Sequence, residues 1–113
     1  MSTENELGKE STMATQIQAL TIAGNAAEGI VVPELAGEGH ASLIVIRLKR
    51  GFLMCGYLSL EKAEQLGDVA VRVAGAGIDE VLANPITGIT KKAQELGIAD
   101  GMTGAEAAAI LNR

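Results

Sequence analysis

The run Leu43-Ile44-Val45-Ile46 constrains the fold of this chain more than any other sequence feature. Its residues are all apolar and mostly β-branched, a pattern typical of a strand that is buried on both faces of a sheet. We place this strand at 41–48 and a second strand at 52–58, joined by the Lys49-Arg50-Gly51 turn. The sequence therefore predicts an antiparallel hairpin in the middle of the chain.

Strand patterns fill the first half of the chain, and helical patterns appear only in the second half. Alternating apolar residues predict strands at 16–22 and 27–32, around a Gly24-Asn25 turn, and a further strand at 68–74. Glycines and capping residues delimit short helices, which we expect at 60–66, 78–83, 87–96 and 103–111. The predicted fold is α+β, with a mainly antiparallel sheet of about five strands and short helices on one face.

We divide the chain into a flexible N-terminal extension, residues 1–13, and a single α+β domain, residues 14–113. The first segment is polar and acidic and shows no apolar periodicity. In the second segment, apolar residues of strands and helices are expected to share one core, formed by Ile44, Ile46, Leu53, Val71, Val73, Ile89, Leu96 and Leu111. Such a core is thin and few helices are available to cover the sheet, so we expect the chain to form a homo-oligomer.

The composition argues against several classes of function. A net charge of −5 and an aromatic content of 2% oppose nucleic-acid binding, which needs a basic surface or stacking platforms. The basic run Arg47, Lys49 and Arg50 is interpreted as a solvated turn. No apolar run approaches the ~20 residues of a membrane helix, and residues 1–13 do not resemble a signal peptide. We therefore expect a cytoplasmic protein without nucleic-acid or membrane partners.

Cys55 is the single cysteine and His40 the single histidine, so neither a disulfide nor a metal site is expected. Cys55 lies in the predicted 52–58 strand, and the glycine that follows it, Gly56, leaves room for a ligand to approach. One interpretation is a thiolate nucleophile or sensor, which requires a nearby cation or helix N-terminus. The other is a buried cysteine that packs as a small apolar side chain. The sequence leaves both interpretations open.

The segment Gly75-Ala76-Gly77 connects a predicted strand to a predicted helix, where free backbone N–H groups favour anions. It fits neither the Walker motif nor the dinucleotide motif, and a plain tight turn is the other interpretation. Arg72 lies within the preceding strand, and it comes near Cys55 if strands 68–74 and 52–58 are neighbours. The candidate site comprises Cys55 as the candidate catalytic residue and Gly56, Arg72, Gly75 and Gly77 as candidate ligand-binding residues for a small anionic ligand.

The string Gly51-Phe52-Leu53-Met54-Cys55-Gly56-Tyr57-Leu58 resembles the YunC-like family, small bacterial and archaeal proteins of unassigned function. The resemblance extends over residues 16–111. It includes the segments Gly29-Ile30-Val31-Val32, Arg72-Val73-Ala74-Gly75, Ala93-Gln94-Glu95-Leu96-Gly97-Ile98 and Gly101-Met102-Thr103-Gly104. The family carries no established activity, cofactor or site residue, so the resemblance implies no function for this chain.

Three classes of function remain compatible with the sequence. The first is a small-molecule or anion binding domain with a regulatory role that self-associates. The second is a thiol-dependent enzyme or redox sensor that uses Cys55. The third is a structural subunit whose role is docking to a partner. The residues do not decide whether the chain is an enzyme, and they indicate no cofactor.

Overall fold

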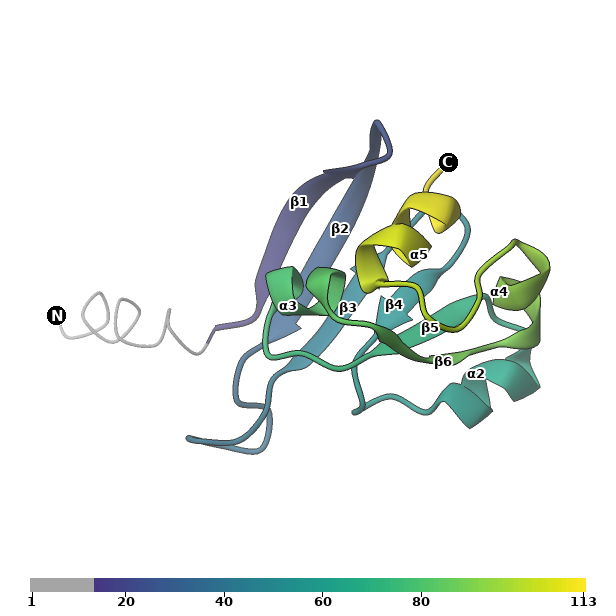
Figure 1. The fold of residues 1–113 in the computed structure, drawn as a ribbon. Helices are drawn as coiled ribbons and strands as arrows, with labels where there is room; N and C mark the ends of the chain where they lie inside the picture. Colours follow the sequence, from purple (N-terminus) through teal and green to yellow (C-terminus); the bar gives the residue numbers. More distant parts are fainter. Residues whose placement is uncertain (1–13) are drawn as a thin grey trace, which may run out of the picture.

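The computed structural model describes residues 14–113, and the predicted N-terminal extension lies outside the described residues. A six-stranded sheet runs through them in the order β1-β2-β3-β4-β5-β6 (Figure 1). The bounds are β1 Gln16–Ile22, β2 Asn25–Val32, β3 Leu43–Arg47, β4 Phe52–Met54, β5 Ala70–Val73 and β6 Ile86–Ile89. Every neighbouring pair is antiparallel except β4 and β5, which are parallel. The predicted α+β fold with a mainly antiparallel sheet is confirmed, with one strand more than expected.

The β1–β2 hairpin is closed by a two-residue loop, Ala23-Gly24. Both loop residues have positive φ, 54° and 78°, as a type I′ turn requires. The twist of such a turn matches that of the flanking strands, and the register runs without interruption from Ile22↔Asn25 to Gln16↔Val31. The turn therefore lies one residue earlier than the predicted Gly24-Asn25 turn, and Asn25 already belongs to β2.

The helices lie on both sides of the sheet rather than on one side as expected (Figure 1). The helices α3 (Ile78–Ala83) and α5 (Gly104–Leu111) pack on one face. There their apolar side chains form the main core with residues such as Ile46, Leu53 and Val71. The helix α2 (Leu60–Leu66) packs on the opposite face, where its Ala63 forms a smaller cluster with Met54 and Ala70. The cause is the parallel β4–β5 pair, whose connection must cross over the sheet and carries a helix with it.

The predicted helix at 87–96 is wrong in its first half, because residues Ile86–Ile89 form β6 beside β5. Only Lys91–Glu95 forms a helix, α4, and it begins after the N-cap Thr90. The β-branched residues Ile86, Thr87 and Ile89 favour a strand, and Gly88 weakens a helix in this position. The prediction that Leu96 belongs to the core is also wrong, since this residue is 36% exposed at the end of α4.

The buried side chain of Asn112 joins the C-terminal helix to two hairpin turns. Its Nδ2 donates hydrogen bonds to the carbonyl oxygens of Ile22 and Asn25, at 2.8 and 3.0 Å. Its Oδ1 accepts a hydrogen bond of 2.9 Å from the backbone N–H of Lys49. Because Asn112 is 0% exposed, these bonds satisfy a polar group that would otherwise be costly to bury. They fix α5 across the sheet.

Among residues 14–113, no helix combines the length and the apolar character that crossing a bilayer would demand.

Candidate functional site

Cys55 directly follows β4 and faces the main core. Leu53 and Cys55 point to the α5 side of the sheet, and Met54 between them points to the α2 side. The backbone N–H of Cys55 donates a 3.1 Å hydrogen bond to the carbonyl oxygen of Ile44. The Cys55 Sγ accepts a 3.2 Å hydrogen bond from the backbone N–H of Ile44. The thiol, 4% exposed, therefore continues the β3–β4 pairing beyond the end of the strand.

The chain leaves the sheet in a turn at Gly56-Tyr57, so the predicted strand 52–58 is shorter than expected. The N–H of Leu58 donates to the carbonyl oxygen of Cys55 at 3.3 Å and closes the turn. No atom lies within 4 Å of the place where a Cβ of Gly56 would stand. The side chain of Tyr57 is 44% exposed. This turn borders open space, as the glycine in this position suggested.

Gly75 follows β5 and packs closely against the helix α3. A Cβ added to Gly75 would lie 2.8 Å from the backbone nitrogen of Val81, so the helix leaves no room for a side chain. Gly77, the N-cap of α3, has an extended backbone and no atom within 4 Å of its would-be Cβ. The two glycines of the predicted turn thus have different roles: Gly75 permits close packing, and Gly77 faces open space.

Three chain segments meet around a hollow of about 270 Å³ at one end of the sheet. They are the residues that precede β3 and the residues that follow β4 and β5. Because β3 runs antiparallel to β4, and β4 parallel to β5, these three segments share the same end of the sheet. The hollow is lined by Ala41, Ser42, Cys55, Gly56, Tyr57, Ala74 and Gly75. Small residues make up most of its wall, and the lining residues whose side chains carry a polar atom are Ser42, Tyr57 and Cys55.

The structure brings together three of the five predicted site residues, namely Cys55, Gly56 and Gly75. Gly77 lines a neighbouring hollow of about 450 Å³, which Ser42 also borders and which contains the carboxylates Asp79 and Glu80. Acidic side chains at that place oppose an anion. The backbone N–H of Ala76 already donates to Glu80 Oε1 at 3.3 Å.

Arg72 lies beside Met54 in the parallel β4–β5 register, so the two strands are neighbours, as the predicted site requires. Its side chain nevertheless points away from the hollow. Val71 and Val73 face the main core, so alternation directs Arg72 to the α2 side. There its Nε donates to Thr87 Oγ1 and its Nη2 donates to the carbonyl oxygen of Thr87, both at 3.1 Å. The hollow around Cys55 contains no cation among its lining residues.

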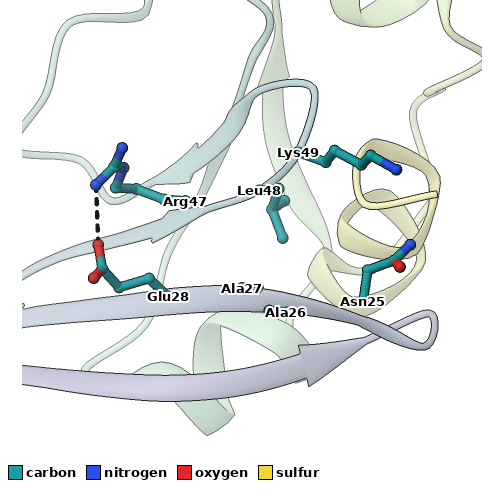
Figure 2. A pocket seen from close by; sticks show the side chains of 7 residues that line it. All are labelled: Asn25, Ala26, Ala27, Glu28, Arg47, Leu48 and Lys49. Carbon is teal, nitrogen blue, oxygen red and sulfur yellow. Dashed lines mark hydrogen bonds and ion pairs between the residues drawn. The ribbon is translucent and has the colours of Figure 1, made fainter.

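Two residues of the basic run, Arg47 and Lys49, line a third hollow, of about 510 Å³, where β2 and β3 separate (Figure 2). Arg47 Nη1 forms an exposed ion pair of 3.1 Å with Glu28 Oε1. Figure 2 shows Arg47 and Glu28 at one end of the hollow and Lys49 extending the opposite way, with Leu48 between them. The two cations do not converge on a point where an anion would sit. Their exposure agrees with the interpretation of a solvated turn.

Sequence reasoning missed Ser42 and Tyr57, the two lining residues of the hollow that carry a hydroxyl group. The predicted strand 52–58 includes Tyr57, although Gly56 before it and the cap Ser59 after it are both typical of a turn. Ser42 gives no sequence signal, because its place depends on the pairing of β3 with β4.

His40 is exposed and lies one residue before the lining residue Ala41. Within residues 14–113, no three His, Cys, Asp or Glu side chains gather as metal ligands would.

The chain is thus an α+β domain with a consecutively ordered six-stranded sheet and a hollow at the shared end of β3, β4 and β5. The family model described as "Domain of unknown function (DUF1805)" matches residues 54–111, just over half of the chain. This chain belongs to that family. The match contains the Cys55–Tyr57 and Ala74–Gly75 walls of the hollow, whereas Ala41 and Ser42 lie before it.

Two relatives support the same assignment. Over 62 residues, the chain is 42% identical to the uncharacterized protein YunC of Bacillus subtilis (strain 168). This region covers 50% of the chain and 61% of YunC, so less than two thirds of that relative's length is matched. The crystal structure of TA1206 from Thermoplasma acidophilum, a protein of unknown function, is similar at a TM-score of 0.78 and 30% identity. The structural match covers 88% of this chain and 94% of TA1206. The resemblance to the YunC-like family is confirmed.

Proposed function

We propose that this domain binds a small, uncharged molecule in the hollow formed by Ser42, Cys55, Gly56, Tyr57 and Gly75. One observation carries the proposal: three separate chain segments contribute small residues and a few polar groups to one open space. Ligand sites in proteins commonly combine a mostly apolar wall with a few placed polar groups. At about 270 Å³ the hollow is slightly smaller than most ligand pockets, so it suits only a small ligand.

The lining residues also indicate which kind of ligand fits. The exposed ring of Tyr57 offers a flat apolar surface on which a planar molecule can stack. Ser42 Oγ already accepts a hydrogen bond of 3.3 Å from the N–H of Glu34, which leaves its own O–H group to donate to a ligand. With Arg72 bound to Thr87 on the other side of the sheet, a neutral ligand has more support than the small anion expected from the sequence.

The thiol-dependent alternative has less support from the geometry. The Cys55 sulfur is almost fully buried and accepts a hydrogen bond from the sheet. A nucleophilic thiol needs a base or a cation beside it, and the lining residues of the hollow include neither. We propose that Cys55 forms part of the wall of the binding site rather than a reacting group.

NMR spectra of the backbone amides, recorded during a titration with benzamide, test the binding proposal. Benzamide is planar, neutral and able to accept a hydrogen bond from Ser42. We expect concentration-dependent shifts confined to the amides of Ala41, Ser42, Gly56, Ala74 and Gly75. Benzoate, which has the same shape and a negative charge, should bind more weakly. Absence of shifts at millimolar benzamide, or shifts centred elsewhere, would contradict the proposal.

Two glycine variants provide a matched pair for this titration. Gly56→Val places a side chain in the open space of the hollow, and Gly77→Val does the same outside it. Neither glycine has an atom within 4 Å of its would-be Cβ, so both variants should fold. We expect Gly56→Val to abolish the benzamide shifts and Gly77→Val to retain them. An unchanged titration of Gly56→Val rules out the hollow as the binding place.

We also propose that the chain self-associates. Support comes from the β1–β3 part of the sheet, on the face opposite to α3 and α5. Ile17, Ile30 and Val45 lie side by side there across three strands, and Ile17 is 69% exposed. The helix α2 packs against Met54 and Ala70 of β4 and β5 and leaves this part uncovered. Apolar surface of this kind is typical of an interface between protein chains.

A further inference from the structure

The strand β1 forms an edge of the sheet and lacks the usual protection against pairing with another strand. It pairs with β2 on its inner side, and no segment within residues 14–113 pairs with its outer side. Soluble proteins protect such edges with charged residues, prolines, bulges or very short strands. Yet β1 has seven residues, none charged and none proline, and its register with β2 is regular.

The opposite edge of the sheet is protected. Strand β6 has only four residues. Its pairing with β5 is irregular between Arg72 and Val73. Just before β6, Pro85 forms an isolated bridge with Thr103, which precedes α5. The contrast singles out β1 as the place where this sheet can be extended.

The hairpin turn determines which backbone groups of β1 point outward. In a hairpin with a two-residue loop, the residues that flank the loop form a hydrogen-bonded pair, here Ile22 and Asn25. Hydrogen-bonded and non-hydrogen-bonded pairs then alternate along an antiparallel ladder. Even-numbered residues of β1 therefore bond to β2. The N–H and C=O groups of Ile17, Ala19 and Thr21 point away from β2.

We infer that two copies of this chain pair their β1 strands antiparallel about a two-fold axis at Ala19, so that one sheet runs through both copies. This inference rests on the proposed self-association and places the contact at the β1 edge, which borders the apolar face of Ile17, Ile30 and Val45 and continues that face into the second copy. In this register Ala19 lies opposite Ala19 of the other copy, and Ile17 lies opposite Thr21. Each of the three outward-pointing residues then exchanges hydrogen bonds with a partner.

The chemistry of the strand favours a second copy as the occupant. An antiparallel pair about a two-fold axis is self-complementary, because both copies offer the same donors and acceptors. The chain carries a net charge of −5, but β1 has no charge of its own, so no like charges meet at the pair. The exposed side chain of Ile17 gains a cross-strand neighbour, Thr21. A shifted register would leave at least one outward residue without a partner.

The first test compares two variants at Ala19 by sedimentation. Ala19→Pro removes an outward N–H without removing a bond to β2, and Ala19→Thr retains the N–H. At concentrations where the unmodified chain sediments at twice the monomer mass, we expect Ala19→Pro to sediment as a monomer and Ala19→Thr as a dimer. A dimer of Ala19→Pro overturns the inference. If Ala19→Pro fails to fold, amide exchange of the unmodified chain decides the question.

Amide hydrogen exchange distinguishes the inference from its rivals residue by residue. We expect slow exchange at Ile17, Ala19 and Thr21 in concentrated samples, and faster exchange of these amides on dilution. A dimer in which the three amides exchange fast overturns the β1 assignment and leaves self-association intact. A monomer at all concentrations overturns both. Protection that does not change with concentration indicates pairing within one chain and also overturns the inference.

Discussion

The backbone N–H of Ile44 donates a 3.2 Å hydrogen bond to the sulfur of Cys55, across the β3–β4 pair. Ile44 is buried, so this N–H has no access to water as an alternative acceptor. The cysteine therefore contributes to the stability of the sheet end that forms the hollow.

Replacement of Cys55 tests this contribution. Cys55→Ala removes the acceptor, and an unpaired buried N–H group costs about 1–3 kcal/mol. We expect the free energy of unfolding in urea to fall by about this amount, and the Ile44 amide to lose its exchange protection. Cys55→Ser retains an acceptor and should retain that protection. An alanine variant with unchanged stability and unchanged exchange at Ile44 would show that the sulfur bond contributes nothing.

A second prediction concerns Gly104, the first residue of α5. A Cβ at this position would overlap the carbonyl oxygen of Val81 in α3, so the two helices approach too closely for any side chain. Gly104→Ala should destabilise the fold by about 3 kcal/mol or more, although alanine favours a helix. Gly56→Ala, which meets no atom within 4 Å and lies outside every helix, is the control and should have the melting temperature of the unmodified chain. Equal melting temperatures for both variants would be evidence against this helix contact.

A third prediction concerns Asn112, which joins α5 to the β1–β2 and β3–β4 turns. Asn112→Leu leaves the N–H of Lys49 and the carbonyl oxygen of Ile22 without this partner, at a cost of about 1–3 kcal/mol for each group that stays buried. Urea unfolding should detect the loss. Asn84→Leu is the matched control, because the Asn84 side chain bonds a single exposed carbonyl, that of Ala74. If Asn112→Leu lowers the free energy of unfolding no more than Asn84→Leu does, Asn112 does not hold α5 to the two turns.

The sequence predicted most of the sheet, because β1, β2, β3 and β5 show local patterns that tertiary contacts did not override. The strand β6 was missed because Ile89 and Ala93 recur at a helical spacing that also fits a strand followed by a short helix. Residues Ile86–Ile89 form a strand only because β5 lies beside them. The pattern of the four residues of β6 carries no information about which strand lies beside them.

The candidate site was predicted in part, for a reason that follows from strand geometry. Cys55, Gly56 and Gly75 come together because β4 and β5 are neighbouring parallel strands, which the sequence hypothesis assumed. Arg72 does not join them, and its alternation with Val71 and Val73 already indicated that it faces the other side. The hydroxyls of Ser42 and Tyr57 depend on where β3 begins and β4 ends, and strand ends are poorly defined by sequence patterns.

The measurement that tests the binding proposal most directly is a nuclear Overhauser spectrum of the chain with benzamide. It reports contacts between ring protons of the ligand and side chains of the protein. We predict cross-peaks to the ring of Tyr57 and to the methyl groups of Ala41 and Ala74, and their loss in Gly56→Val. Cross-peaks to Ala26, Ala27 or Leu48 in the hollow between β2 and β3, or no cross-peaks at all, would contradict the proposed site.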